Sequence, residues 1–369
     1  MLEVIDLNLN KKTKYNYDIL GRIAGEKIIS TGNNLTKAKL SIRYDDAKNR
    51  VAGYDVNVEG IGKSTDFVYG ENNLAPDIIT SVKQNGTQSI GYGYDSLNRL
   101  STRTLNTTTP FETEYEYLDG TAPVRTTTFV ESVINGSSTL SYDYDDLGNI
   151  TSVYKNGEFI EGYDYDMNSV LRMSMKGSDV WVYNYDNGGN ITSVTKNGTT
   201  VKSYTYGDAE WKDLLTGYNG ETFVYDEIGN PITWRGEMTL DWLDGRRLSV
   251  IMKDYDHISY TYNADGLRNS KYVTGVTTDY YWLNGTLQAQ KTGSEYIVFL
   301  HDENGVAYGF LLKNGATEEY YYYIFNVQGD VIGILDSSGT QVVEYTYNPW
   351  GEILSITGTM AETIGQKNP

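Results

Sequence analysis

Short runs of alternating residues are the dominant pattern along the chain. In "YDYDDLGNITSVYKNG", Tyr142 to Gly157, Tyr142 and Tyr144 fall on one face of an extended strand and Asp143 on the other. A second run follows an Asp/Gly segment, and an Asn-Gly pair closes the stretch. No sustained heptad or 3.6-residue apolar stripe is present. The pattern therefore predicts strands of about six residues joined as antiparallel hairpins.

The same stretch returns with variation along the chain. "YNYDNGGNITSVTKNG", Tyr183 to Gly198, begins 41 residues later and matches at 12 of 16 positions. The second aromatic of each copy marks the register, because Tyr144, Tyr165, Tyr185, Tyr206 and Tyr225 are separated by 21, 20, 21 and 19 residues. A unit of about 20 residues builds an extended wall. A propeller with blades of 41 residues is an alternative, weakened because the half-repeats resemble one another as two-strand units should.

Two kinds of turn explain the unit. Asp145 can start a type I turn with Gly148 following in the left-handed region, whereas Asn156-Gly157 suits a type I′ hairpin. Asn-Gly also occurs at Asn85, Asn135, Asn197, Asn219, Asn284 and Asn314. The residues expected to define the repeat are Tyr144, Asp145, Gly148, Asn149, Tyr165, Asp166, Tyr185, Asp186, Gly189, Asn190, Tyr225, Asp226, Gly229, Asn230, Tyr262, Gly266, Gly329, Tyr347 and Gly351.

Composition restricts the classes of function. The chain has 34 Tyr and 38 Gly, which favours pleated sheets over helices. No apolar run approaches the roughly 18 residues of a membrane span, and "MLEVIDLNLN" has neither a basic nor an apolar region of a signal peptide. Cysteine is absent, which excludes thiolate nucleophiles, disulfides and Cys-based zinc sites. A net charge of -19 disfavours nucleic acid as a partner.

Candidate catalytic groups are few. His257 and His301 are the only imidazoles, so a triad or a multi-histidine metal site would have to use one of two residues. Carboxylate pairs such as Asp145 and Asp146 recur in every turn, and turn chemistry explains them without catalysis. "NADG", Asn263 to Gly266, lacks the spacing and terminal Glu of an EF-hand loop. We therefore expect no catalytic residue, no cofactor and no metal.

The units carry a family resemblance. Y-x-Y-D-x-x-G-N-I/L units about 20 residues apart resemble those of Rhs/YD-repeat proteins over most of the chain, from about Tyr44 onward. The strongest stretch is "YYIFNVQGDVIGILDSSGTQVVEYTYNPWGE", Tyr322 to Glu352, which resembles the segment leading into the Rhs-associated core. "WLDGRRLSV", Trp242 to Val250, also resembles a typical unit of that family.

The resemblance implies an all-β fold of antiparallel hairpins, wound as a spiral into a hollow cocoon that encloses a C-terminal toxin. It suggests a degenerate repeat edge at residues 1–43, a YD-repeat shell at 44–319 and the start of the Rhs-associated core at 320–369. The expected function is a non-enzymatic shell of a secreted or cell-surface bacterial polymorphic toxin. Its partner would be its own toxin domain or further repeats, and the self-cleavage motif would follow the "GQKNP" at residues 365–369. The alternative is a repeat array that binds cell-wall carbohydrate.

Overall fold

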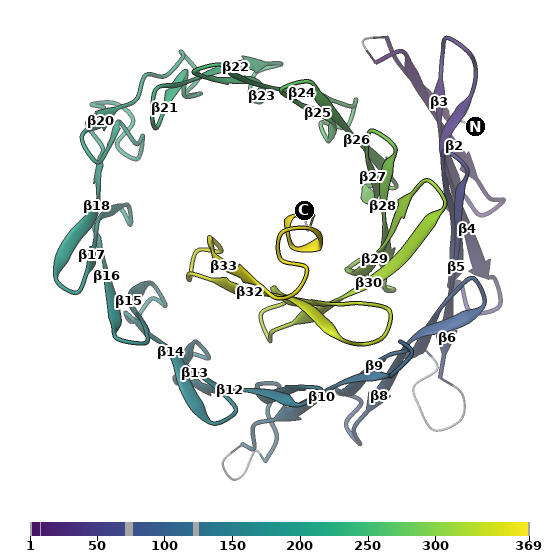
Figure 1. Ribbon diagram of the computed structural model, residues 1–369, viewed down its shortest axis with the longest axis horizontal. Helices are drawn as coiled ribbons and strands as arrows, with labels where there is room; N and C mark the ends of the chain where they lie inside the picture. Colours follow the sequence, from purple (N-terminus) through teal and green to yellow (C-terminus); the bar gives the residue numbers. More distant parts are fainter. Residues whose placement is uncertain (1, 8, 71–76, 121–124, 368–369) are drawn as a thin grey trace. The chain divides into compact units, whose positions relative to one another are not determined.

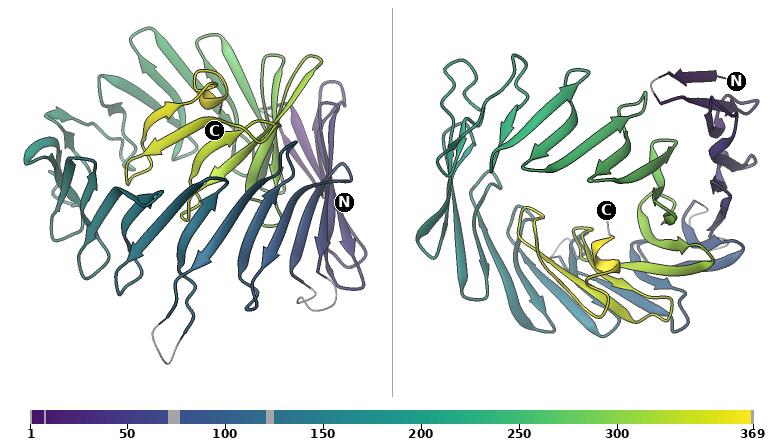
Figure 2. Two further views of the ribbon diagram at one scale, coloured as in Figure 1. Left: turned by 60° about the horizontal axis from the view of Figure 1, so that its bottom comes forward. Right: turned by 45° about the horizontal axis from the view of Figure 1, so that its top comes forward.

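The computed structural model describes residues 2–7, 9–70, 77–120 and 125–367, and its elements are almost entirely β-strands. One short 3-10 helix, η1 (Ile364–Gln366), lies near the C-terminal end, and no α-helix occurs among the described residues. Within the runs β1–β9, β11–β20 and β21–β33, each strand pairs with the next in sequence, so the hairpins follow one another along the chain (Figures 1 and 2). The predicted all-β hairpin fold is confirmed.

The strand bounds fall into three groups. The first group is β1 (Leu2–Asp6), β2 (Lys11–Tyr17), β3 (Ile23–Ser30), β4 (Thr36–Asp45), β5 (Arg50–Val58), β6 (Ile61–Tyr69), β7 (Ile79–Gln84), β8 (Thr87–Tyr94), β9 (Leu100–Leu105) and β10 (Phe111–Tyr117). The second is β11 (Val130–Asn135), β12 (Ser138–Tyr144), β13 (Ile150–Lys155), β14 (Glu158–Tyr165), β15 (Leu171–Lys176), β16 (Asp179–Tyr185), β17 (Ile191–Lys196), β18 (Thr199–Thr205), β19 (Gly217–Tyr218), β20 (Glu221–Thr222), β21 (Thr233–Trp234), β22 (Met238–Leu243) and β23 (Arg247–Lys253). The third is β24 (Asp256–Tyr262), β25 (Arg268–Val273), β26 (Val276–Leu283), β27 (Thr286–Thr292), β28 (Glu295–His301), β29 (Ala307–Asn314), β30 (Thr317–Phe325), β31 (Val331–Leu335), β32 (Gln341–Tyr347) and β33 (Ile353–Thr357).

The chain divides into two compact units. Unit 1 contains residues 1–113 and 260–369, and unit 2 contains residues 114–259. The division into segments 1–43, 44–319 and 320–369 concerns family architecture and stays a prediction; residues 1, 8, 368 and 369 of those segments lie outside the described residues.

Unit 1 is built from two layers of sheet. Strands β4 to β9 turn one face toward strands β26 to β31 (Figure 1). One buried cluster joins Leu40, Val56 and Val58 to Leu283 and Val298, and another joins Val82, Ile90 and Leu105 to Leu300, Tyr308 and Leu335. Burial of these side chains is the main stabilisation of the two-layer contact.

The C-terminal strands of unit 1 are buried on both faces. Their second face carries Phe310, Tyr321, Tyr323 and Tyr345, and Ile364 of η1 packs against that cluster. The hydroxyl of Tyr345 donates to the carbonyl of Gly365 at 2.9 Å. This double burial explains why "YIVFL" of β28 and "YYYIF" of β30 are continuous apolar runs instead of alternating ones.

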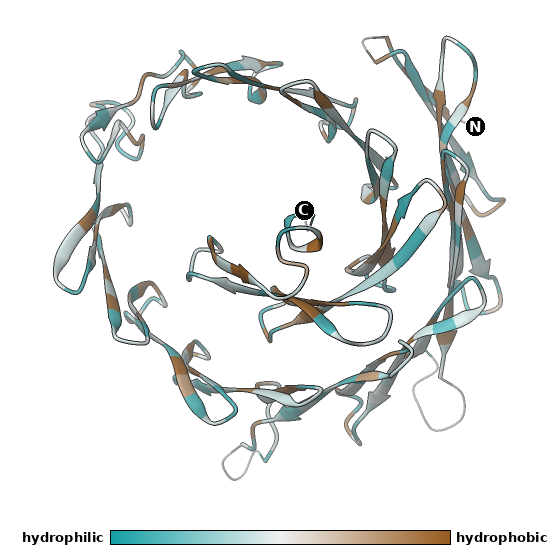
Figure 3. Cartoon of the chain, viewed as in Figure 1, coloured by the Kyte–Doolittle hydropathy of each residue, from teal (hydrophilic) through white to brown (hydrophobic). Residues whose placement is uncertain are grey.

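Unit 2 contains a single layer of sheet with two different faces. Cross-strand pairs such as Tyr142 with Val153 and Tyr183 with Val194 form one face, which we call the tyrosine face. Asp143 with Ser152 and Asn184 with Ser193 belong to the other, which we call the opposite face. Hydrophobic and hydrophilic residues therefore both occur along each strand (Figure 3).

The repeat is interrupted near the end of unit 2. The sequence predicts a regular hairpin at "FVYDEIGNPI", Phe223 to Ile232, but only an isolated bridge joins Tyr225 to Pro231. The flanking strands β19, β20 and β21 have two residues each. Proline has no N–H to donate to a ladder, which explains the interruption.

Candidate functional site: the tyrosine face and its turns

The Asp/Gly turns are held by one aspartate each. Oδ1 of Asp145 accepts the backbone N–H groups of Leu147 and Asn149 at 3.0 and 2.8 Å, and Oδ2 accepts Nδ2 of Asn149 at 2.9 Å. These hydrogen bonds, with the one from the Asn149 side chain as the largest contribution, lower the pKa of Asp145. Gly148 has the expected left-handed φ of 86°. The carboxylate is thus used in the turn, as the sequence suggested.

The other predicted repeat residues occupy matching positions. Asp186 with Asn190 and Asp226 with Asn230 repeat the same contacts, and Gly189 and Gly229 have φ of 87° and 83°. In the turn of Asp166 the left-handed residue is Ser169, with φ of 61°. Asparagine replaces aspartate in the turns of Gly266, Gly329 and Gly351. Where arginine stands in place of Asn149, as at Arg22 and Arg99, it forms an ion pair with the turn aspartate at 2.6 Å.

The repeated tyrosine of each unit bonds to the neighbouring strand. Its hydroxyl donates to a backbone carbonyl at or next to the start of the preceding strand, at 2.6 to 3.0 Å. The pairs are Tyr44 with Ile23, Tyr69 with Val51, Tyr94 with Ile79, Tyr144 with Val130, Tyr185 with Leu171, Tyr206 with Ile191 and Tyr347 with Val331. In two units the indole Nε1 of Trp242 or Trp282 does the same at 2.7 Å. Sequence reasoning missed this contact, although the fixed place of the second aromatic signals it.

We expect Tyr144→Phe to destabilise unit 2 by about 1 kcal/mol, because the carbonyl of Val130 loses its hydroxyl donor. Tyr154→Phe is the matched control, since its hydroxyl bonds only to the exposed Asp143. Urea unfolding of both variants measures the difference. Equal midpoints for the two variants would show that the tyrosine contact does not stabilise the repeat.

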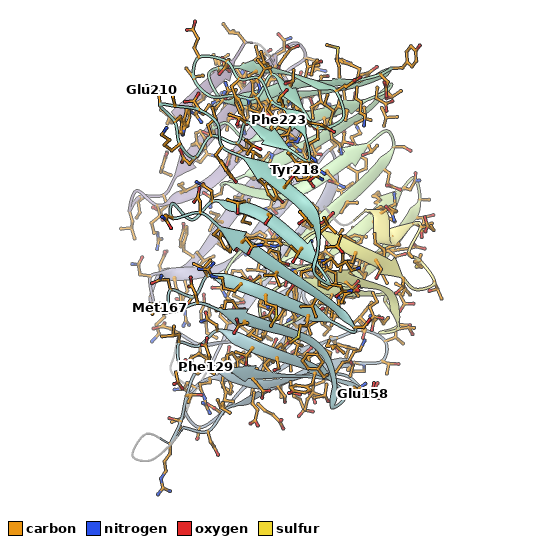
Figure 4. All side chains as sticks on the ribbon, turned by 90° about the vertical axis from the view of Figure 1, so that its left-hand side faces the viewer. Phe129, Glu158, Met167, Glu210, Tyr218 and Phe223 are labelled. Carbon is orange, nitrogen blue, oxygen red and sulfur yellow. The ribbon has the colours of Figure 1, made fainter. Side chains whose placement is uncertain are left out.

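The Asn-Gly turns close the other end of the strands. Asn156 and Gly157 have φ of 53° and 82°, as a type I′ turn requires. The Asn156 N–H donates to the carbonyl of Thr139 at 2.8 Å, and its Oδ1 accepts the N–H of Thr139 at 2.9 Å. The same pair of bonds joins Asn85 to Ser64, Asn197 to Val180 and Asn219 to Ser203. Figure 4 shows Glu158 at this end of the strands, and Phe129 and Met167 at the end of the Asp/Gly turns.

Two Asn-Gly pairs differ from the prediction. Asn135 and Asn314 end their strands, and only Gly136 and Gly315 have positive φ, at 60° and 59°. Asn135 pairs with Ser138, so the loop consists of Gly136 and residue 137. Glycine at the first central position is typical of a type II′ turn. The dipeptide alone does not decide which residues form the loop, because the strand register shifts it by one position.

We expect Gly148→Val to be more destabilising than Gly157→Val. Both place a β-branched residue at positive φ, which costs about 1–2 kcal/mol. A Cβ on Gly148 would also lie 2.9 Å from the ring of Phe129, which packs on Tyr144 with ring centroids 5.0 Å apart, whereas Gly157 has no atom within 4 Å of that position. Urea melts of the two variants test this order. An equal loss would mean that Phe129 moves away without cost.

The tyrosine face is covered in one unit and open in the other. In unit 1 it carries Leu40, Val56, Val82 and Ile90, and the layer of β26 to β31 covers it. In the described part of unit 2 a single sheet presents the equivalent face, with Tyr142 and Tyr183 at 4% and 5% exposure through packing within that sheet. The same sequence pattern therefore produces a face that can accept a second layer of polypeptide.

Charged groups lie between the two layers of unit 1. Lys63, 7% exposed, donates from Nζ to the carbonyl of Phe299, and no carboxylate of the described residues pairs with it. Burial lowers the pKa of Lys63 to about 7. Burial opposes ionisation of Glu59, but bonds from Lys291, Lys37 and Tyr296 at 2.6 to 2.7 Å outweigh it and lower its pKa to about 2. Glu59 thus connects a turn of the first layer to β27 and β28 of the second.

Other titratable groups form no catalytic arrangement in the described part of the chain. Burial, followed by the nearby charge of Lys63, lowers the pKa of His301 to about 3. His257 lies on the exposed strand β24. The described residues contain no group of three His, Cys, Asp or Glu side chains that could hold a metal ion. No helix in the described ranges is long and apolar enough to cross a membrane.

Comparison with known proteins places this fold. A family model described as Teneurin YD-shell matches residues 155–365, more than half of the chain. The chain therefore belongs to the Teneurin YD-shell family, which confirms the resemblance to Rhs/YD-repeat proteins. A crystal structure of TcdB2-TccC3-Cdc42 matches 95% of this chain with a TM-score of 0.75 and 15% identity, over 20% of its own length. A Photorhabdus luminescens Tc holotoxin pore matches 98% of this chain with a TM-score of 0.72 and 14% identity, over 21% of its length. The fold is that of a YD shell.

Curated relatives match a smaller part of the chain. The tRNA3(Ser)-specific nuclease WapA of Bacillus spizizenii is 33% identical over 141 residues, which is 37% of this chain and 6% of that protein. The tRNA(Glu)-specific nuclease WapA of Bacillus subtilis subsp. natto is 31% identical over the same shares. The chain thus spans a small fraction of the length of these relatives.

Proposed function

We propose that this chain is a non-enzymatic part of the wall of a polypeptide-encapsulating shell, and that the tyrosine face of unit 2 contacts the enclosed polypeptide. The enclosed segment would be a toxin domain of the same protein, exported to or beyond the bacterial surface and used against competing or host cells. The TccC3 and WapA similarities support this reading, since their names belong to a Tc toxin and to nucleases.

The observation that carries the proposal is the different covering of one face in the two units. In unit 1 the tyrosine face packs against strands from the C-terminal third of the chain. In unit 2 the same face is part of a single sheet. A face already suited to polypeptide in one place can accept polypeptide in the other.

Carbohydrate binding is the alternative from the sequence. A sugar site would need ring faces and hydroxyls that are available to the ligand. Here seven repeat tyrosines donate their hydroxyls to backbone carbonyls, and the Arg22 and Arg50 guanidinium groups lie 3.9 and 3.6 Å from the ring centres of Tyr44 and Tyr69. These contacts favour a structural role for the aromatic rows.

Adjacent residues on one strand allow a direct test. Lys202 lies on the tyrosine face, opposite Val194, and Ser203 lies on the opposite face, across from Ser193. The chain has no cysteine, so Lys202→Cys and Ser203→Cys each create a single thiol. Each thiol would receive a maleimide-linked photocrosslinker, in a chain extended after residue 369 by an epitope-tagged polypeptide.

We expect the tagged segment to crosslink from position 202 and not from position 203. Crosslinks that are equal from both positions, stronger from position 203, or absent from both would contradict encapsulation against the tyrosine face. Crosslinking is compared at low protein concentration, where contacts between molecules decrease and contacts within one molecule do not.

A further inference from the structure

The opposite face of unit 2 has an unusual composition in one hairpin. In β13 and β17 the residues on this face include Ser152, Ser193 and Thr195, and Val153 and Val194 lie on the tyrosine face. In β15 the arrangement is reversed, because Met173 and Met175 lie on the opposite face and Ser174 on the tyrosine face.

The reversal in β15 is not a register error. Met173 pairs with Val182 and Met175 with Val180 in an unbroken ladder, so β16 also places valines on this face. Ser174 is 3% exposed and its hydroxyl lies 3.0 Å from that of Tyr183, so the polar side chain is satisfied on the tyrosine face. The apolar residues therefore stand on the opposite face within a regular sheet.

These side chains join those of the preceding hairpin. Tyr154 and Phe159 are cross-strand partners with ring centroids 5.9 Å apart. Gly162 lies between the hairpins, and a Cβ there would be 3.0 Å from both the Met175 methyl group and the Phe159 ring. We call the resulting surface the methionine patch; it consists of Tyr154, Phe159, Met173, Met175, Val180 and Val182. Phe159 is 46% and Val182 36% exposed, which is more than folding of a polar face requires.

The charge around the methionine patch is negative. Asp164 lies directly across from Met173, is exposed, and forms no ion pair with any described residue. Asp143 is exposed on the same face, where one carboxylate oxygen accepts the hydroxyl of Tyr154 at 2.9 Å. Acidic side chains outnumber basic ones in unit 2, and the whole chain has a net charge of -19.

We propose that the methionine patch is a docking surface for a basic amphipathic polypeptide segment, with apolar side chains that pack on Met173 and Met175 and lysine or arginine residues that reach Asp143 and Asp164. Methionine side chains adapt their shape to different apolar partners. Charge complementarity favours a basic partner. A second copy of this chain, or an anionic lipid surface, would instead bring like charges together. The patch lies on the face opposite to the proposed cargo contact, so the two proposals are independent.

The neighbouring repeat supplies the natural substitution for a test. Met173→Ser with Met175→Thr gives β15 the opposite-face residues of β17, Ser193 and Thr195, and leaves every charge unchanged. Val201→Thr is the matched control, because Val201 is 42% exposed on β18 and lies outside the patch. The probe is a fluorescent peptide of alternating leucine and lysine, and fluorescence anisotropy measures its binding to each full-length chain.

We expect the double variant to bind the leucine-lysine peptide about tenfold more weakly than the parent, and Asp164→Asn to bind it about threefold more weakly. Val201→Thr should bind it as the parent does, and a leucine-glutamate peptide should bind no variant. Unchanged affinity in the double variant overturns the proposal. So does self-association of the chain, or binding to anionic phosphatidylserine vesicles, that the double variant abolishes while peptide binding persists. Circular dichroism checks that each variant is folded.

Discussion

Replacing Lys63 with methionine is expected to stabilise the protein, by roughly 3 to 5 kcal/mol near pH 6. The ammonium group is buried between the two layers of unit 1 with a single carbonyl acceptor, and burial lowers its pKa from 10.5 to about 7. A shift of one pKa unit corresponds to about 1.4 kcal/mol of preference for the neutral form. Loss of the hydrogen bond to Phe299 offsets part of the gain, by about 1 kcal/mol.

The gain should depend on pH in a defined direction. Between pH 7 and pH 10.5 the unfolded chain binds a proton at Lys63 that the folded chain does not bind, so stability of the parent rises with pH in this window. Below pH 7 the lysine is charged in both states and the full cost of burial is present. The advantage of Lys63→Met should therefore be greatest below pH 7 and nearly vanish at pH 10.5.

Urea unfolding at pH 6, 8 and 10 measures this dependence. Lys39→Met is the matched control, because Lys39 is exposed on the adjacent strand β4. A stability difference between the Lys63→Met variant and the parent that stays constant across these pH values, or a loss of stability at pH 6, would contradict the account of Lys63 as a buried and uncompensated cation.

Phe310→Ala is expected to destabilise unit 1 by about 3 to 5 kcal/mol, because a fully buried aromatic side chain leaves a cavity. Phe310 has 0% exposure, and its ring stacks on Tyr321 with centroids 5.3 Å apart and lies 5.7 Å from Tyr323. The loss should weaken the contact with η1 at the same time, since Ile364 belongs to the same cluster.

The control is Tyr255→Ala, since the side chain of Tyr255 is fully exposed in the turn between β23 and β24. Its free energy of unfolding should stay within about 0.5 kcal/mol of the parent. Unfolding is followed by near-ultraviolet circular dichroism and fluorescence, because a chain with two units need not unfold in one step. A loss below 1 kcal/mol for Phe310→Ala would show that the cluster reorganises around the missing ring.

Local structure was largely predictable from the residues. Alternation at Tyr142, Asp143 and Tyr144 and the fixed spacing of the aromatics predicted hairpins of two strands. Left-handed φ at Gly148 and Gly157 follows from steric rules that act within a few residues. The prediction was wrong at Asn135 and Asn314, where strand register moved the loop, and at Pro231, where the missing N–H interrupted the ladder.

The contacts of the candidate site were less accessible to sequence reasoning. The tyrosine ladder was predicted as a face of the sheet, but the hydroxyl of Tyr144 reaches a carbonyl 14 residues away, and this depends on the placement of the preceding strand. The pattern of Met173, Ser174 and Met175 is readable in the sequence, but its meaning requires the strand register, because a shift by one residue exchanges the two faces.

By itself, the sequence determined the repeat unit, the two turn types and the single-sheet pattern, because backbone sterics, alternation and local hydrogen bonds operate within about 20 residues. Only the tertiary structure decided which part of the tyrosine face is covered. Val58 and Val298 meet in one cluster although 240 positions separate them, and Lys63 becomes a buried cation only where β28 lies over it. Packing between distant segments depends on how the sheet curves and closes on itself, which the same repeated pattern permits in unit 1 and leaves open in unit 2.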